Sequence, residues 1–496
     1  MTSAPRLLAA TLCSTLALGA SVVRAEVDLG AIDTFVNEER VAQRIPGLAL
    51  GIVQRDRVVH VAGFGSADDA GRSVDGGTPF FLGSTTKSFT ALAIMQLVEA
   101  GRVRLDAPAR EYLPWFRVAD ERASAAITVR ELLNQTSGLS SRTGRLTLTD
   151  FASDDDAIEN RVRLLARVAL TAPVGDRLQY SNANYQVLGA IVQHVAGEPY
   201  EAYVAKHIFA PLAMTHSFTA KAPAVAAGLA LGHRAMFDRP IAFDEPYARG
   251  GLPQGFVVSS ASDMTHYLIA QLNGGRYDDT SVLSSDGVAQ MHRGVAGDAD
   301  EGRYAMGWIE GTRFDRMAVW HGGDTFSYQT FMVLLPAEGW GVVLLANVNN
   351  VPAVLRFESI AWGVLGRLLD VPAPREHVHD SLVVHGVVMG IVLLQLLGLM
   401  RTATLLPRWR RAPQVRPSPQ MKAVRIGAPF LVNAAWSLLV LAGIPRAFGP
   451  LHALVTAVPD LGWVLVASAS FAGVWAIVRA MLAFSALRSP VPAVAL

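Results

Sequence analysis

The spacing of hydrophobic and polar positions predicts helices and strands in alternation along most of the chain. A helical period covers residues 28–44, and two apolar runs within residues 48–65 are separated by a polar turn, as in a hairpin. Residues 88–101 predict an amphipathic helix that ends at a glycine, and residues 354–369 predict a terminal helix. Between them, two apolar runs separated by residues 337–340 predict a second hairpin. Antiparallel strands with helices at both ends predict an α+β domain whose sheet is covered on both faces.

The pattern changes after residue 381, where three long apolar runs begin. They cover residues 382–400, 426–444 and 461–480, and each is close to the ~20 residues that cross the hydrocarbon core of a bilayer. These runs contain no Asp, Glu or Lys, the side chains that mark ion pathways, which favours an anchor over transport or sensing. The alternative is that the three-helix region has its own function and that the preceding domain regulates it.

The loop between the first two apolar runs indicates the orientation. It carries basic residues and no acidic ones: Arg401, Arg408, Arg410, Arg411, Arg416, Lys422 and Arg425. Positively charged loops stay in the cytoplasm. We therefore expect a multi-pass protein of the cytoplasmic (inner) membrane, with a domain of residues 26–372 on the extracytoplasmic side and residues 373–381 as the linker to the bilayer region, 382–496.

The N-terminal stretch agrees with this orientation. Residues 1–25 contain Arg6, a long apolar run and a small residue, Ala25, at their end, which is the pattern of a secretory signal peptide. Whether it is cleaved stays open. The only cysteine, Cys13, lies in this stretch, so a cleaved chain would have no disulfides, no thiolate chemistry and no cysteine-based zinc site.

Composition limits the classes of partner. The chain is 51% hydrophobic and 17% charged, against about 25% charged residues in soluble domains, which again favours lipid. Its formal net charge of +1 gives no field that attracts nucleic acid. We expect no cofactor and no metal. The acidic run of residues 153–157 could bind a cation, but together with Glu159 it is expected to cap a helix. His377 and His379 lie in the linker without a nearby partner.

A lysine in the stretch FLGSTTKSFTAL suggests nucleophilic catalysis. Lys87 is the only lysine of the first two hundred residues, although arginine is frequent there. If a helix starts near Ser84, then Ser84 and Lys87 share a face, and burial near the helix N-terminus would lower the lysine pKa. A neutral amine can then deprotonate the serine, whose own N–H can stabilise an oxyanion. The alternative is a capping serine and a surface lysine.

Two further stretches carry polar groups suited to a hydrolase. In QYSNANY, Tyr180 and Asn182 would share a face of an extended segment, where a phenol lowered in pKa by an ammonium can relay protons. The alternative is a core tyrosine and a helix-capping asparagine. In WHGGDTFSY, His321 and Gly323 end a strand pattern, and glycine lets a substrate approach the strand edge. The alternative is a tight loop with a solvated histidine.

Taken together and in this order, Ser-x-x-Lys, Tyr-x-Asn and His-x-Gly resemble the motifs of the penicillin-recognising serine hydrolases. This group includes class C β-lactamases, D-alanyl-D-alanine carboxypeptidases and related esterases and D-aminopeptidases. The stretches ITVRELLNQTSGL, YSNANYQVLGAIVQHVAGEPYEAYVAKHIFAPLAMTHS and FMVLLPAEGWGVVLLAN also resemble the group. The resemblance covers about residues 30–365 and implies a β-lactamase-like or DD-peptidase-like fold, an antiparallel sheet with flanking helices plus an all-α subdomain that holds Tyr180.

The resemblance also implies roles. Ser84 would form an acyl-enzyme, Lys87 and Tyr180 would be the base system, and Asn182 would orient the lysine and the substrate amide. The N–H groups of Ser84 and Asp324 would form the oxyanion hole, with His321 and Gly323 lining the substrate site. The substrate would be a small molecule or peptide with an ester or amide bond.

The third motif departs from the family pattern. Class C β-lactamases have lysine and threonine where this chain has His321 and Gly322, and a neutral imidazole with a bare glycine binds a carboxylate poorly. This puts β-lactamase and carboxypeptidase activity in doubt and favours an esterase or peptidase. The remaining alternative is a module that binds penicillin or cell-wall peptide without turnover.

Overall fold

The computed structural model describes residues 27–298, 302–350, 354–373, 381–411 and 418–488. The expected signal peptide, and His377 and His379, lie outside the described residues. Among those described, an eight-stranded antiparallel sheet has the order β2-β1-β14-β13-β12-β11-β10-β9. The bounds are β1 Gly47–Gln54, β2 Arg57–Gly65, β9 Ala296–Asp298, β10 Gly302–Tyr304, β11 Ile309–Arg313, β12 Arg316–Asp324, β13 Gln329–Leu335 and β14 Trp340–Ala346.

Both predicted hairpins are confirmed as β1–β2 and β13–β14. One boundary was wrong, because Trp340 does not belong to the turn. It opens β14, where it pairs with Leu335 on one side and Gln54 on the other. Its indole is almost fully buried against the helices on that face, which favours pairing over a loop position.

The central strand β1 shows why the sheet has two covered faces. Leu48, Leu50 and Ile52 pack against α1 (Leu29–Ala42) and α14 (Val354–Leu369), the two helices predicted at the ends of this region. Ala49 and Val53 point the other way, into a core that includes α2 (Thr86–Glu99) and α12 (Ala261–Leu272). Successive side chains of a strand alternate between faces, so a fully apolar strand requires cover on both sides.

Helix α2 differs from its prediction as an amphipathic helix. Every residue from Thr86 to Met95 is buried, because the helix runs through the core between α12 and the helical subdomain around α8 (Asn182–Ala196). The subdomain contains α3 Ala109–Tyr112, α4 Glu121–Ala126, α5 Val129–Leu133, α6 Ser141–Arg145, α7 Ala157–Arg163 and α9 Tyr200–Val204. The acidic run of residues 153–157 leads into α7 with Asp156 at the N-cap position, but the prediction that it caps the helix was wrong, because the side chain of Asp156 makes no capping hydrogen bond.

Short elements connect the sheet to this subdomain. They are β3 Pro79–Phe81 paired with β6 Val258–Ser260, β4 His233–Met236 with β5 Arg239–Ala242 and β15 Val348–Asn349, β7 Arg276–Tyr277 with β8 Thr280–Ser281, and the helices α10 Lys221–Ala226, α11 Leu252–Gly255 and α13 Ser285–His292. The β3–β6 pair leads the chain directly into α2, which determines where residues 83–87 lie.

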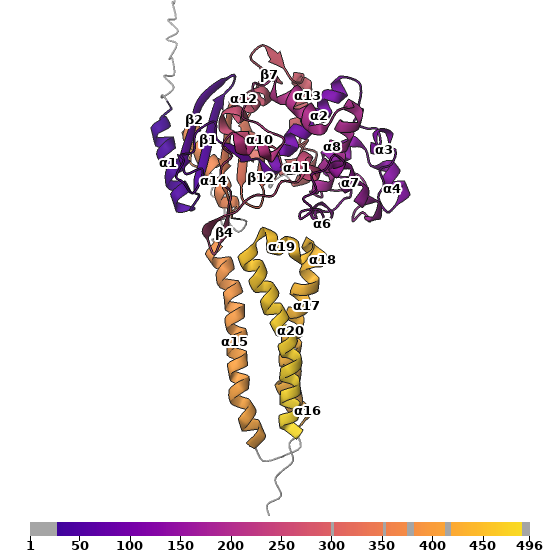
Figure 1. The fold of residues 1–496 in the computed structure, drawn as a ribbon, viewed down its shortest axis with the longest axis vertical. Coiled ribbons are helices and arrows are strands. Elements are labelled where there is room, and N and C mark those ends of the chain that lie inside the picture. Colours follow the sequence, from indigo (N-terminus) through magenta and orange to yellow (C-terminus); the bar gives the residue numbers. More distant parts are fainter. Residues whose placement is uncertain (1–26, 299–301, 351–353, 374–380, 412–417, 489–496) are drawn as a thin grey trace, which may run out of the picture.

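Three helices that are long and apolar enough to cross a membrane extend from one side of this body (Figure 1). They are Val383–Arg410 within α15 (Ser381–Arg411), Pro419–Ala447, and Pro459–Ala486 within α20 (Pro459–Arg488). The middle helix consists of α16 Pro419–Lys422, α17 Ala428–Leu438 and α18 Ile444–Phe448 joined by π-helical turns, and α19 Leu451–Ala457 leads into α20. Each run is longer than the apolar stretch identified in the sequence.

The end of the helical bundle nearest the sheet contacts the β4–β5 hairpin. Asp460 at the start of α20 accepts hydrogen bonds from the backbone N–H of Phe237 at 2.7 Å and from His385 Nε2 of α15 at 2.8 Å. Arg234 Nη1 donates to the carbonyl oxygen of Thr456 at 2.8 Å. These bonds join α19 and α20 to the β4–β5 hairpin and connect α15 to α20.

Candidate active site

Ser84 lies in a 3₁₀ turn, Gly83–Thr85, between β3 and α2. Gly83 has φ +56°, and a Cβ there would lie 2.5 Å from the backbone nitrogen of Asp324. Gly323 is equally constrained, because its Cβ would lie 2.1 Å from the carbonyl oxygen of Leu82 and 3.1 Å from the nitrogen of Ser84. The end of β12 therefore passes so close to the serine turn that only glycine fits at either position.

Lys87 lies in the first turn of α2 and is completely buried. Its Nζ is 2.9 Å from Ser84 Oγ and donates to the carbonyl oxygen of Gln254 at 2.9 Å. No carboxylate forms an ion pair with it among the described residues, and burial lowers its pKa well below the usual value for a lysine. The structure thus brings serine and lysine together and holds an amine without a counter-ion.

Tyr180 lies beside this pair. Lys87 Nζ is 4.9 Å from the centroid of its ring, and its hydroxyl interacts with Ser84. Burial, followed by the neighbouring Tyr304, raises the pKa of Tyr180 well above its ordinary value. The expectation that a neighbouring ammonium lowers the pKa of Tyr180 was wrong. Burial favours the neutral form of Lys87, and the loss of solvent around the phenol raises the pKa of Tyr180. Tyr180 is therefore a neutral phenol that can donate a proton.

Asn182 is also near the site, but its local structure differs from the prediction. It is the first residue of α8, preceded by Ser181 as the N-cap, and is not part of an extended segment. No hydrogen bond joins it to Lys87, whose second bond goes to the carbonyl oxygen of Gln254. The Oδ1 atom of Asn182 is buried without a partner among the described residues, so it can accept a hydrogen bond from a bound molecule.

The backbone of β12 presents a second N–H to the serine turn. Thr325 N donates to the carbonyl oxygen of Tyr328 at 3.0 Å, which closes the β12–β13 hairpin. In an antiparallel ladder the next pair, Asp324 with Gln329, is then not hydrogen-bonded across the two strands. The N–H of Asp324 is consequently not used in the ladder with β13, and its nitrogen lies next to Gly83, the residue before Ser84.

His321 is buried in β12 and is not the solvated loop residue of the alternative hypothesis. Its Nδ1 lies 2.5 Å from the carbonyl oxygen of Gly322, so Nδ1 carries the proton and Nε2 accepts from the Tyr304 hydroxyl at 3.3 Å. Burial, reinforced by Lys87, lowers the pKa of His321 to about 3. The imidazole is neutral at physiological pH and offers no positive charge to a substrate carboxylate.

Three residues of the site were not assigned from the sequence. Tyr304 from β10 packs edge-on against Tyr180 with ring centroids 5.7 Å apart. Gln135, at φ +62°, accepts hydrogen bonds at Oε1 from the backbone of Ser181 at 2.9 Å and from the side chain of Asn184, which fixes the start of α8. Gln254 contributes a backbone carbonyl, and a carbonyl leaves no side-chain signal in a sequence.

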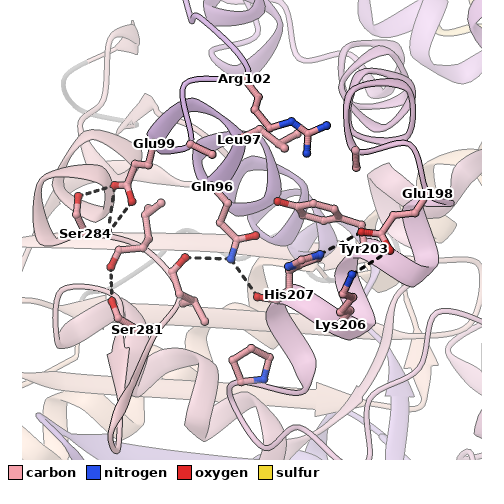
Figure 2. A pocket seen from close by; sticks show the side chains of 15 residues that line it. Gln96, Leu97, Glu99, Arg102, Glu198, Tyr203, Lys206, His207, Ser281 and Ser284 are labelled. Carbon is pink, nitrogen blue, oxygen red and sulfur yellow. Dashed lines mark hydrogen bonds and ion pairs between the residues drawn. The ribbon is translucent and has the colours of Figure 1, made fainter.

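A separate cavity of about 800 Å³ lies at the other end of α2 (Figure 2). Its charged side chains are largely paired with one another: Glu198 contacts His207 at 3.1 Å and Lys206 at 3.8 Å, and Glu99 accepts from Ser284. It contains none of the groups around Ser84. No cluster of three metal-binding side chains occurs among the described residues.

Comparison with known proteins agrees with this geometry. The family model described as Beta-lactamase matches residues 31–361, which is more than half of the chain. The chain belongs to the beta-lactamase family. Its long apolar C-terminal helices lie beyond the matched residues.

Individual relatives of this beta-lactamase family protein are moderately similar. Penicillin-binding protein 4 of Amycolatopsis lactamdurans is 30% identical over 342 residues, which cover 68% of this chain and 89% of that protein. Protein flp of Staphylococcus aureus (strain COL) is 29% identical over 329 residues, 64% of this chain; the match spans 63% of that relative's length. The octameric penicillin-binding protein homologue from Pyrococcus abyssi superposes with a TM-score of 0.61 at 27% identity, covering 70% of this chain and 79% of that chain.

Proposed function

We propose that this protein is a membrane-anchored serine hydrolase that cleaves an ester or amide through an acyl group on Ser84. The observation that carries the proposal is the buried, unpaired amine of Lys87 at 2.9 Å from Ser84 Oγ. A neutral amine at this distance accepts the serine proton as Oγ attacks the carbonyl carbon. The N–H groups of Ser84 and Asp324 then hold the oxygen that becomes negative.

Tyr180 has a distinct role in this mechanism. As a neutral phenol next to Ser84, Tyr180 can donate its proton to the leaving group and take back a proton from the Lys87 ammonium, which returns Lys87 to the neutral amine. Lys87 can then receive the proton of the water that releases the acyl group and pass it to Ser84 Oγ, which restores the starting state. The unpartnered Oδ1 of Asn182 is the acceptor that we assign to a substrate N–H. Lys87 is therefore the base, and Tyr180 assists it as an acid.

The third motif suggests which substrates are preferred. His321 is neutral, and the side chain of Asp324 is exposed beside it, so this edge carries no cation. We propose that uncharged esters or amides are accepted there in preference to substrates with a free carboxylate. The apolar C-terminal helices would hold the domain at the extracytoplasmic face of the cytoplasmic membrane, as the basic loop indicates.

The relative named penicillin-binding protein 4 motivates a second candidate, a module that is acylated by penicillins without turnover. The purified chain should be tested with a fluorophosphonate, a fluorescent penicillin and a chromogenic ester, with Ser84→Ala as the matched control. Ester turnover that the control lacks supports the hydrolase. Stable penicillin labelling of Ser84 without ester turnover supports the binding module, and no labelling by any probe contradicts both.

A further inference from the structure

An open cavity of about 730 Å³ lies along the three C-terminal helices, remote from Ser84. It lies between α15, the Pro419–Ala447 helix and α20, whose arrangement is visible in Figure 1. Most of its wall is aliphatic or aromatic. The apolar lining residues are Ile391, Leu394, Gly398, Leu405, Trp409, Val424, Pro429, Val432, Trp436 and Trp475.

Three arginines line the same cavity. Arg479 of α20 donates from Nε to Thr402 Oγ1 at 3.0 Å and from Nη1 to the carbonyl oxygen of Arg425 at 2.7 Å, which fixes its guanidinium across all three helices. Arg425 lies over the ring of Trp409 at 5.1 Å, and Arg401 completes the group. No Asp or Glu lines the cavity, and none of the three arginines has an ion pair with a described residue.

This arrangement lacks a counter-ion. A guanidinium in apolar surroundings costs free energy unless an anion pairs with it. A guanidinium also has five N–H donors, and Arg479 donates through only two of its nitrogens, Nε and Nη1, in the hydrogen bonds described above. Arg401 is exposed and Arg425 and Arg479 are half-buried, and since the lining supplies no carboxylate, a bound anion can supply the missing negative charge. The aromatic and aliphatic wall favours a molecule that also carries a long apolar part.

We propose that this cavity binds one anionic phospholipid, with its phosphate on Arg401, Arg425 and Arg479 and an acyl chain along the apolar wall. Arg401 lies about 30 Å along α15 from its first residue, at the end of the bundle remote from the sheet. That end carries the basic loop, where anionic headgroups of the cytoplasmic leaflet gather between basic helix ends. A phosphatidylcholine fits less well because its choline cation would enter an arginine-lined site.

The test is lipid retention by the full-length protein in native mass spectrometry. With dioleoyl phosphatidylglycerol and dioleoyl phosphatidylcholine compared at equal concentrations, we expect one phosphatidylglycerol to be retained about tenfold better. Arg479→Gln and Arg425→Gln should each reduce that retention about fivefold. Arg408→Gln is the matched control, because Arg408 is exposed on α15, carries the same charge and does not line the cavity.

A second measurement does not depend on arginine variants that fold poorly. Brominated phosphatidylglycerol should quench tryptophan fluorescence more than brominated phosphatidylcholine does, and Trp436→Phe, which removes one of the three tryptophans that line the cavity, should reduce the difference. Trp463→Phe should not, because Trp463 lies on α20 outside the cavity and is 63% exposed.

Three results would overturn the lipid site. The first is equal retention and equal quenching by the two lipids. The second is a loss in Arg408→Gln as large as in Arg479→Gln, which would mean diffuse attraction to the basic loop. The third is complete displacement by inorganic phosphate at millimolar concentration, which would make this a site for a bare anion.

Discussion

Replacing Lys87 with methionine tests the central claim about the site. Methionine keeps the length and the burial of the side chain but cannot accept the proton of Ser84, which lies 2.9 Å from the amine. General-base catalysis contributes about 10²–10⁴-fold to a rate, equivalent to roughly 3–5 kcal/mol of barrier. We expect kcat for a chromogenic ester to fall by at least about a hundredfold, with little change in KM.

The same substitution has a signature in stability. Burial lowers the pKa of Lys87 in the folded state, so the unfolded chain binds one proton more at every pH between that lowered pKa and about 10.5. Within this window the free energy of unfolding of the wild type rises with pH by up to about 1.4 kcal/mol per unit, and this contribution is lost as pH falls. The Lys87→Met variant should lack this contribution.

The assay therefore combines ester turnover with denaturant unfolding between pH 6 and 9 for both proteins. The Ser84→Ala variant sets the background, and the double variant Ser84→Ala/Lys87→Met should be no slower than Ser84→Ala, because the two groups act as a unit. Turnover by Lys87→Met within twofold of the wild type, or parallel stability curves, would refute a neutral catalytic amine.

Three further predictions address β12 and the hairpin turn that follows it. Gly323→Ala should lower the thermal unfolding temperature and reduce kcat at least about tenfold, because the added Cβ would meet the Leu82 carbonyl oxygen. Gly322→Ala is the control, since its Cβ would meet only the end of a glutamate side chain, at 2.9 Å; thermal unfolding and ester turnover compare the two variants. His321→Gln should leave the shape of the pH–rate profile between pH 5 and 8 unchanged, since the pKa of His321 is lowered to about 3, and a lost inflection near pH 6 would contradict this. Glu245 accepts hydrogen bonds from Thr325 and Ser327, in the turn between β12 and β13, and burial raises its pKa to about 7. Stability should therefore fall by up to about 3 kcal/mol as pH rises from 4.5 through 7, and chemical denaturation of Glu245→Gln should show no such fall.

The helices and strands with a regular spacing of apolar residues were predictable, because in these elements the apolar positions are the ones that are buried. The helices around residues 28–44 and 354–369 and both hairpins occur where apolar periodicity placed them. Helix α2 shows the limit of this approach: it occurs close to the predicted residues 88–101, but the pattern indicated a helix with one exposed face, whereas Thr86 to Met95 are buried on all sides. The start of α8 was misjudged for a related reason: Asn182 suits both a helix start and a turn, and the contacts of Gln135 with Ser181 and Asn184 decide between them.

The order of residues was enough to identify the chemistry available to this protein: a serine and a lysine one helical turn apart, and three apolar stretches with a basic loop. Those properties depend on neighbours along the chain, where spacing translates directly into position. The protonation states, in contrast, depend on the folded arrangement. Burial of Lys87, Tyr180 and His321, and the carbonyl of Gln254 beside the amine, come from segments far apart in the sequence. A pKa depends on the solvent and charges around a group in space, and sequence order does not specify that surrounding.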